Sequence, residues 1–303
     1  MTLSARKKAQ RQKIEELADA MGVEILAHFY QREEVKDLAH FVGGSRSILE
    51  RAKVSKANAL VICGVSFVSD IAMGIRPDIP VLVPRADASC PYSESLAPET
   101  ITKVRKLYPE AIIAAGLKTH KSLLKYCDII LPPNPTPSYW EKFNGRRVFV
   151  LPSLDEAPFG LPGVQVFGKA PLCQIHAQIE AKEVLEAKER FPAATVIANI
   201  LCTPMVKALA DYALDSDGIA DFVRESTGEE FLVIAESGLV ISLAILNPGK
   251  KFYELETEMF CPNMKLTNIK DILYALEELM RQQGGLSETG KFSHKERNNA
   301  LFG

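Results

Sequence analysis

Short apolar runs alternate with amphipathic stretches along most of the chain. The runs that read as strands cover residues 23–31, 59–67, 79–84, 111–117, 127–133, 146–152, 194–202 and 230–237. Apolar residues at helical spacing predict helices over residues 5–21, 34–43, 69–77, 98–108, 168–192, 203–214, 217–226 and 268–283. Because parallel strands buried on both faces read as continuous apolar runs joined by helices, this order predicts an α/β fold.

The repeated order of strand and helix suggests three similar α/β units, although no sequence repeat is visible. We expect an N-terminal helix and first α/β domain over residues 1–105, a second domain over 106–190 and a third over 191–280, followed by a polar tail over 281–303. The length of 303 residues agrees with this division, because one domain typically has about 100–200 residues.

The composition is that of a globular protein, with 47% hydrophobic and 24% charged residues. A net charge of −2 gives no long-range attraction to nucleic acid or to an anionic membrane. The longest uncharged apolar run, residues 57–69, ends at Asp70 and is shorter than the roughly 18 residues of a membrane span. We therefore expect neither a nucleic acid nor a membrane as partner, and the sequence does not set the oligomeric state.

The N-terminus and the cysteines indicate a compartment. The first residues are basic and then amphipathic, with no apolar signal core, and Glu15 and Glu16 argue against a transit peptide. We expect a cytoplasmic protein, in which the six cysteines do not form structural disulfides. The alternative reading of each cysteine is a small buried hydrophobic residue.

Several polar residues stand where predicted strands end. These residues are His28, Tyr30, Cys90, Cys202 and Glu236. In parallel α/β sheets, ligands bind outside the carboxyl ends of the strands, so these positions predict one shared site.

Several stretches, in order along the chain, resemble the quinolinate synthase family. They include HFYQREEVKDLAHFVGGS at residues 28–45, VLVPRADASC at 81–90, the segment from PLCQIH to NILC at 171–202, FLVIAESGL at 231–239 and FCPNMKLTNI at 260–269. The resemblance extends over about residues 14–280, and the order of these matches is more specific than any one of them.

This resemblance implies three pseudo-symmetric, three-layer αβα domains around a central cavity. It also implies a [4Fe–4S] cluster held by Cys90, Cys202 and Cys261, with a fourth iron left open to act as a Lewis acid. The spacing of these cysteines contains no CxxC pattern and does not by itself predict a cluster. The remaining cysteines, Cys63, Cys127 and Cys173, are expected to serve in packing.

The resemblance also implies a set of site residues. His28, Tyr30 and Glu236 match positions with catalytic roles, and Ser45 matches a serine that binds a substrate carboxylate or phosphate. The further residues expected to bind substrate are Arg46, Lys118, Asn134, Asn199, Ser216 and Asp217. The plainer alternatives are a hydrogen-bonded histidine at a strand end, a helix cap for Ser45 and a surface carboxylate for Glu236.

Several pocket positions depart from the family pattern. Gly116 stands where the family has a tyrosine, Lys118 replaces an asparagine and Ala235 replaces a threonine. Asn199 replaces a histidine, Leu201 replaces a glutamate and Asp217 replaces a threonine. Leu201 cannot move a proton, and Asp217 disfavours an anionic substrate unless Lys118 or Arg46 offsets its charge. These changes favour a related enzyme that condenses or dehydrates a different small anionic substrate.

Three other functions remain open at this stage. One is quinolinate synthase itself, which makes quinolinate for NAD biosynthesis from iminoaspartate and dihydroxyacetone phosphate. A second is a non-catalytic, cluster-bearing sensor or scaffold. The third, a nucleotide-binding α/β protein, has little support because the chain contains no GxGxxG motif and no Walker lysine loop.

Overall fold

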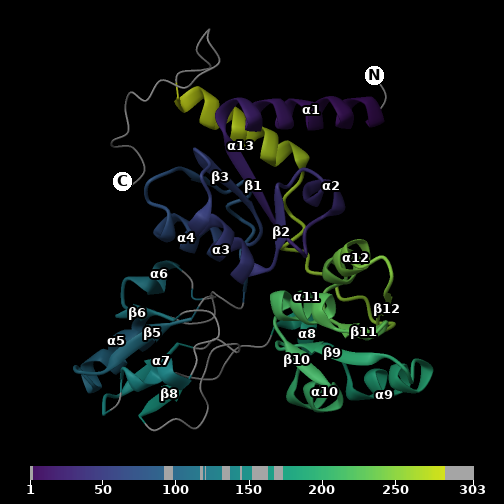
Figure 1. The fold of residues 1–303 in the computed structure, drawn as a ribbon. Helices are drawn as coiled ribbons and strands as arrows, with labels where there is room; N and C mark the ends of the chain where they lie inside the picture. Colours follow the sequence, from purple (N-terminus) through teal and green to yellow (C-terminus); the bar gives the residue numbers. More distant parts are fainter. Residues whose placement is uncertain are drawn as a thin grey trace.

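The computed structural model shows an α/β fold built on parallel sheets, as the apolar runs predict (Figure 1). The structure describes residues 3–91, 98–116, 119, 121–131, 137–143, 145–151, 163–166 and 173–283. Within them the strands form three four-stranded sheets, and every pairing is parallel.

The first sheet has the strand order β2-β1-β3-β4. Its strands are β2 (Phe41–Gly43), β1 (Val23–His28), β3 (Ala59–Cys63) and β4 (Val81–Leu82). Because successive side chains of a strand point to opposite faces, Leu26 and Ile62 enter one core while Ile25 and Val61 enter another. The helices that follow these strands are α2 (Glu33–Lys36), α3 (Ser45–Val54) and α4 (Ser66–Ile75).

The second sheet has the order β6-β5-β7-β8. Its elements are α5 (Pro98–Leu107), β5 (Ile112–Ala115), α6 (Lys121–Leu124), β6 (Ile129–Ile130), α7 (Pro137–Glu141), β7 (Val148–Val150) and β8 (Val164–Val166). Small cores lie on both of its faces: Trp140 packs with Val148 on one, and Ile101 packs with Ile113 on the other.

The third sheet has the order β10-β9-β11-β12. Its strands are β9 (Thr195–Asn199), β10 (Tyr212–Leu214), β11 (Glu230–Ile234) and β12 (Lys251–Tyr253). Its helices are α8 (Gln174–Ala177), α9 (Ala181–Arg190), α10 (Pro204–Leu209), α11 (Ser216–Glu225) and α12 (Ser237–Leu246). Ile197 and Phe231 of this sheet belong to the same apolar core as Leu26 and Ile62 of the first, so the two sheets share a buried centre.

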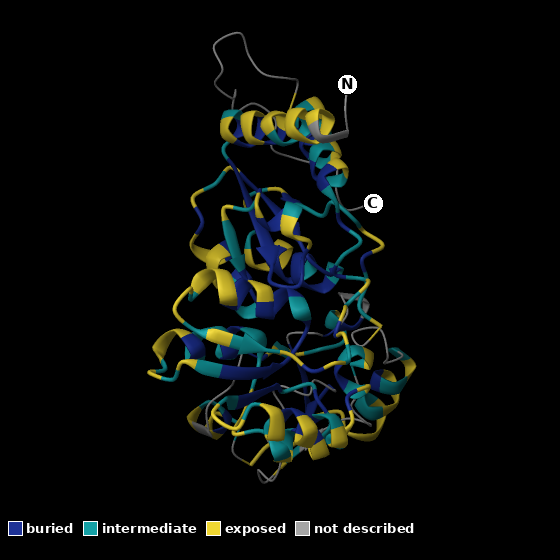
Figure 2. Cartoon of the chain, turned by 90° about the vertical axis from the view of Figure 1, so that its right-hand side faces the viewer, coloured by how far each residue is buried: buried dark blue, intermediate teal, exposed yellow. Residues whose placement is uncertain are grey.

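The two longest helices, α1 (Leu3–Met21) and α13 (Ile269–Gln282), lie side by side on the first sheet (Figure 1). Ile14 of α1 and Ile272 of α13 are fully buried in one core with the side chains of β1 and β3. Figure 2 shows the outward faces of these helices as exposed and the sheet beneath them as buried. The chain therefore returns to its first sheet at its last described helix.

Four strands were not predicted, and all of them are edge strands. Residues 34–43 were expected to be one helix but form α2 and then β2, and residues 203–214 form α10 and then β10. The strands β8 and β12 were also missed. The expected helix over 168–192 is interrupted, since α8 and α9 are separate helices in its described part. Edge strands are short and paired on one side only, which leaves a weak apolar pattern.

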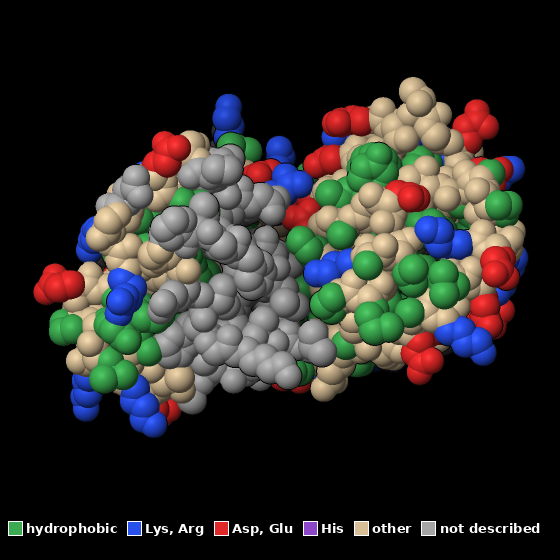
Figure 3. Space-filling model, turned by 90° about the horizontal axis from the view of Figure 1, so that it is seen from below, with side chains coloured by type: hydrophobic (Ala, Val, Ile, Leu, Met, Phe, Trp, Pro, Cys, Tyr) green, Lys and Arg blue, Asp and Glu red, His purple; other side chains and the backbone are tan. Residues whose placement is uncertain are grey.

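The described helices include none that combines the length and the apolar character needed to cross a bilayer. On the face seen from below, the described side chains mix hydrophobic groups with charges of both signs (Figure 3). That part of this face therefore carries no broad field of one sign.

Candidate active site

A cavity of about 430 Å³ lies where the carboxyl ends of the first and third sheets meet. The predicted site residues on its wall are His28, Tyr30, Ser45, Arg46, Cys90, Asn199, Ser216, Asp217 and Cys261. They come from strand ends, helix starts and two loops that are up to about 230 residues apart in the chain. Of the five polar residues expected to share one site, His28, Tyr30 and Cys90 line this cavity.

His28 is the last residue of β1 and is 3% exposed. Its Nδ1 atom accepts a hydrogen bond of 3.1 Å from the backbone N–H of Tyr30. The neutral imidazole therefore carries its proton on Nε2. The Tyr30 ring meets the imidazole edge-on, with 4.6 Å between the ring centroids, so the histidine is held in one orientation.

The Tyr30 hydroxyl joins the two halves of the cavity wall. Its oxygen lies 2.8 Å from Oγ of Ser216, and the side-chain amide of Asn199 donates to it at 3.2 Å. Burial is the largest cause that raises the pKa of Tyr30, so the phenol stays protonated and neutral. The cavity therefore presents a chain of uncharged hydroxyl and amide groups between β1 and α11.

Asp217 lies in the first turn of α11 and reaches across to the N-terminus of α3. Its carboxylate accepts hydrogen bonds from the backbone N–H groups of Gly44 at 2.7 Å, Arg46 at 3.1 Å and Ser47 at 3.2 Å. The Ser47 hydroxyl also donates to it. The sequence suggests that the side chain of Lys118 or Arg46 offsets this negative charge; the nearby charge of Arg46 interacts favourably with Asp217, and the backbone donors also stabilise the carboxylate.

The guanidinium of Arg46 bonds to other carboxylates. It donates to Asp221 at 3.1 Å and lies within ion-pair distance of Asp215 at 3.8 Å and Glu50 at 3.6 Å. Burial acts to lower the pKa of Arg46, but the hydrogen bond to Asp221 and the nearby charges of Asp217, Asp215 and Glu50 outweigh it, so the pKa is raised. Arg46 is thus a charged residue of the wall whose positive charge is already balanced.

The three cysteines that were expected to hold a cluster lie around the same cavity. Cys90 and Cys261 line it, and Cys202 lies behind the wall, 3% exposed. The side-chain amide of Asn263 donates a 2.8 Å hydrogen bond to the backbone carbonyl of Ser89, which ties the Cys261 loop to the Cys90 loop. Burial raises the pKa of Cys202 to about 12 and the pKa of Cys261 to about 11, and the neighbouring Cys173 adds to both.

Among the described residues, no group of three His, Cys, Asp or Glu side chains could hold a single metal ion. The ligands of a four-iron cluster attach to different irons, so its thiols need not converge on one point. Thiols that stay protonated through burial would lose their protons on binding iron, which couples binding to proton release.

Glu236 lies two residues after β11 and caps the N-terminus of α12, but it does not line the cavity, because its side chain is fully buried beneath the wall. It forms an ion pair of 2.6 Å with Lys265 and accepts hydrogen bonds from the backbone N–H groups of Cys261 and Gly238. Lys265 also donates to the backbone carbonyl of Tyr30 at 2.7 Å. Burial raises the pKa of Glu236 despite these partners. This pair connects the Cys261 loop to the end of β1.

Some residues of the site were not anticipated, and others lie outside the described residues. Lys118 and Asn134 belong to the second group. Cys173, expected only to pack, lines the cavity and lies 3.3 Å from Nδ1 of the buried His176. Lys265 lies in the segment FCPNMKLTNI, four residues after the predicted ligand Cys261. A positive charge so close to a predicted ligand is a feature of the sequence that indicates a role at the site.

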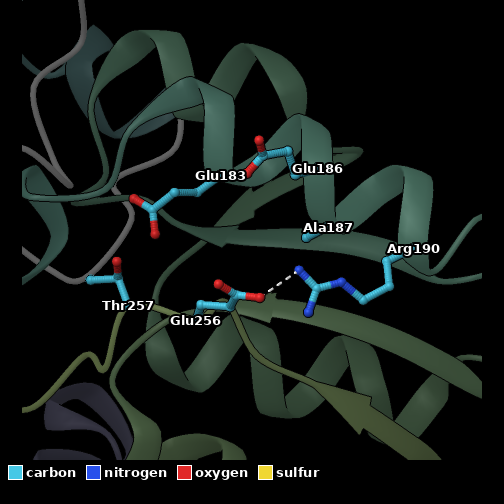
Figure 4. Close-up of a pocket in the computed structure, with 6 residues that line it drawn as sticks. All are labelled: Glu183, Glu186, Ala187, Arg190, Glu256 and Thr257. Atoms are coloured by element: carbon cyan, nitrogen blue, oxygen red, sulfur yellow. Dashed lines mark hydrogen bonds and ion pairs between the residues drawn. The ribbon is translucent and has the colours of Figure 1, made fainter.

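A second, shallower pocket lies on the surface between α9 and the segment after β12 (Figure 4). It is lined by acidic side chains and by an ion pair of 3.0 Å between Arg190 and Glu256. One of its carboxylates, Glu183, completes the capping box of α9, so its position has a structural explanation.

The fold and the cavity define an α/β protein with a thiol-bearing pocket of small-molecule size. The sequence model of the quinolinate synthetase A protein family matches residues 12–291. Among curated proteins, the quinolinate synthase of Thermodesulfovibrio yellowstonii is 32% identical over 84% of this chain and 85% of its own length. The quinolinate synthases of Caldicellulosiruptor saccharolyticus and Pelobacter propionicus are 30% and 29% identical, over 88% and 89% of this chain and 89% and 90% of their own lengths. The chain belongs to the quinolinate synthase family.

Proposed function

We propose that this chain is an iron–sulfur enzyme that performs a condensation and dehydration of the quinolinate synthase type. The observation that carries the proposal is that Cys90, Cys261, His28 and Tyr30 line one cavity, while Cys202 is buried directly after the lining residue Leu201. These residues come from the carboxyl ends of parallel sheets, where α/β enzymes bind their substrates.

The three cysteines would hold a [4Fe–4S] cluster. Such a cluster supplies a Lewis-acidic iron that favours the departure of a hydroxyl group. The chain itself has to keep the three thiols at fixed separations. The hydrogen bond from Asn263 to Ser89 and the Glu236–Lys265 pair support the two loops that carry Cys90 and Cys261.

The remaining residues bind the substrate and move its protons. His28 has a defined tautomer and a ring held in place by Tyr30, which suits it to exchange a proton near neutral pH. The Tyr30 phenol, kept neutral by burial, orients a substrate oxygen together with Asn199 and Ser216. Glu236 is a positioning residue, because its contacts are to Lys265 and to the backbone of the cysteine loop.

The relatives favour quinolinate as the product. Every relative named above is a quinolinate synthase that matches nearly its whole length, and the family model covers most of this chain. In that reaction iminoaspartate condenses with dihydroxyacetone phosphate, with loss of water and phosphate. This candidate would place the chain in NAD biosynthesis.

The composition of the wall favours a second candidate, a related condensation or dehydration on another small substrate. Leu201 lines the cavity without a group that can carry a proton, and the Asp217 carboxylate occupies the N-terminus of α3. Both features bear on which substrate fits and leave the cluster ligands unchanged.

One anaerobic experiment tests the proposal and separates the candidates. The purified chain, reconstituted with iron and sulfide, is incubated with iminoaspartate and dihydroxyacetone phosphate, and quinolinate is measured by chromatography. We expect product, and a rate at least about 100-fold lower in Tyr30→Phe and His28→Gln. A loaded cluster without quinolinate would favour the second candidate, and a chain that takes up no iron would refute the proposal as a whole.

The repeated strand order supports a wider architectural proposal. In each sheet, the strand that comes first along the chain is the second strand across the sheet, as β1 is in β2-β1-β3-β4. We propose that residues 1–105, 106–190 and 191–280 approximate three related units around the cavity, except that α5 packs with the second sheet and α9 with the third, and that α13 packs back onto the first. We propose as well that the enzyme works in the cytoplasm, where its thiols stay reduced.

A further inference from the structure

The N-terminus of a helix exposes backbone N–H groups that bind anions, and α3 directs this end toward the cavity. Ser45 and Arg46, its first residues, belong to the cavity wall. A substrate phosphate or carboxylate would find these donors directly in reach.

These donors are already occupied by a group from the other side of the cavity. Asp217 accepts hydrogen bonds from the N–H groups of Gly44, Arg46 and Ser47, and it also takes the Ser47 hydroxyl. The carboxylate is only 5% exposed, so it is held in place and shielded from water. Bonds from N–H groups to a carboxylate are charge-assisted and about twice as strong as neutral ones, so the carboxylate is not easily displaced.

The space at this end is also closed. A side-chain carbon at Gly44 would collide with both oxygens of Asp217, so glycine is required there for the carboxylate to approach the backbone. An incoming anion would have to displace Asp217 from all four of its hydrogen bonds.

The charges of the surrounding wall also disfavour a bound anion at this end of the cavity. Among the described lining residues, Arg46 is the one Lys or Arg, and its guanidinium is bonded to Asp221 and faces Asp215 and Glu50. A second anion placed beside Asp217 would therefore meet a carboxylate, and the one described cation of the wall, Arg46, already interacts with Asp217 and the neighbouring carboxylates.

We propose that Asp217 is a built-in anion that determines the substrate specificity of this end of the cavity. It takes the place of a substrate phosphate or carboxylate at the N-terminus of α3, so the substrate group bound there is uncharged and carries hydroxyl or amide functions. The neighbouring groups fit such a substrate, because Tyr30, Ser216 and Asn199 offer hydroxyl and amide partners. This inference rests on the proposed condensation and dehydration in this cavity. If quinolinate is the product, the phosphate of its precursor binds against another wall.

The test is to remove the carboxylate and ask whether the site becomes an anion site. In Asp217→Ser the three N–H groups lose their partner, and inorganic phosphate can bind them. We expect isothermal calorimetry to give at least tenfold tighter phosphate binding in the variant than in the unchanged chain. Phosphate should also raise the melting temperature of the variant alone. Dihydroxyacetone phosphate should behave like phosphate, and uncharged dihydroxyacetone should show no such gain.

The matched control is Asp221→Ser. It removes one negative charge from the same helix and from the same arginine, but leaves Asp217 on the N-terminus of α3. We expect phosphate binding in this control to equal that of the unchanged chain. A gain in the control as large as that in Asp217→Ser would overturn the proposal, because the effect would then be one of general charge.

Two more outcomes decide the matter. If folded Asp217→Ser gains no phosphate affinity, or if the unchanged chain binds phosphate as tightly, the proposal is wrong. If Asp217→Ser does not fold alone, Asp217→Asn replaces it, because asparagine keeps the shape of the side chain and removes its charge. A rise in the melting temperature of Asp217→Asn with phosphate supports the proposal, and no rise refutes it. These measurements need no turnover. A chain that takes up iron and forms product but fails them refutes only the inference, whereas a chain that passes them without iron uptake refutes only the proposed function.

Discussion

The side-chain amide of Asn263 and the backbone carbonyl of Ser89 are 2.8 Å apart and joined by a hydrogen bond. Ser89 precedes Cys90, and Asn263 follows Cys261 by two residues. Two loops that are far apart in sequence are thus fixed to each other next to the thiols they carry. The separation of these thiols decides whether they can hold one cluster.

Replacing this amide should loosen the thiol pair. In Asn263→Ala we expect iron and sulfide binding to weaken about fivefold, because one hydrogen bond contributes about 1 kcal/mol. Metal analysis after reconstitution at limiting iron measures this. Asn58→Ala is the control, since Asn58 makes an equivalent 3.1 Å bond to the Met21 carbonyl away from the cavity. Equal iron uptake in Asn263→Ala and the unchanged chain would contradict the prediction.

The thiols themselves can be separated into ligands and packing residues. We expect Cys90→Ser, Cys202→Ser and Cys261→Ser each to lose the visible absorbance of a reconstituted cluster. Cys127→Ser should keep it, because the Cys127 thiol donates to the backbone carbonyl of Leu123 in α6, outside the cavity. Full absorbance in any of the three variants would remove that cysteine from the ligand set.

Removing one partner of the buried ion pair between Glu236 and Lys265 should lower the unfolding free energy substantially. Lys265→Met leaves the Glu236 carboxylate buried without its cation, and we expect a loss of about 3–5 kcal/mol in unfolding free energy. Adding Glu236→Gln to this variant should restore part of the loss, because the second change removes the unpaired charge. Urea unfolding of the two single variants and the double variant gives the coupling energy, and strictly additive losses would show that the pair is not coupled.

The contact of Asp221 with Arg46 should appear in the pH dependence of stability. Burial acts to raise the pKa of Asp221, but the hydrogen bonds from Arg46 and Arg224 outweigh it, so the pKa is lowered. The contribution is therefore present above the ordinary Asp pKa of about 3.9 and is lost as the pH falls through the lowered value. Asp221→Asn should be less stable than the unchanged chain at pH 7, by less than about 1 kcal/mol of unfolding free energy at this half-exposed site, and the difference should close as the pH falls through the lowered pKa. A gap that widens in acid would contradict this sign.

The sequence predicted the central strands well and the edges poorly, for a physical reason. The strands β1, β3 and β5 are buried along their whole lengths, so they read as apolar runs. In contrast, β10 is mostly exposed and β12 is at most half-buried, and each has only three residues. Their place in the sheet follows from pairing with a neighbouring strand, which the local pattern does not encode.

The same limit applies to the site. His28, at the end of a central strand, could be predicted because the chain order of strands and helices already places it at that edge of the sheet, whereas Asn199 was expected only from the family resemblance. The sequence could show that Asp217 adds a negative charge, but not that it meets the backbone of Gly44 across the cavity. That contact joins positions 173 residues apart and depends on how two sheets share one core.

The pairing of α1 with α13 also affects how the chain is made. Ile14 and Leu17 are buried against Ile272 and Leu276, so part of that face of the first sheet stays uncovered until α13 has been synthesised. The N-terminal part of the nascent chain must therefore wait, with apolar surface exposed, for a segment that follows it by about 250 residues. Folding from the N-terminus onward cannot finish the first unit, and premature termination before residue 269 would leave an aggregation-prone product.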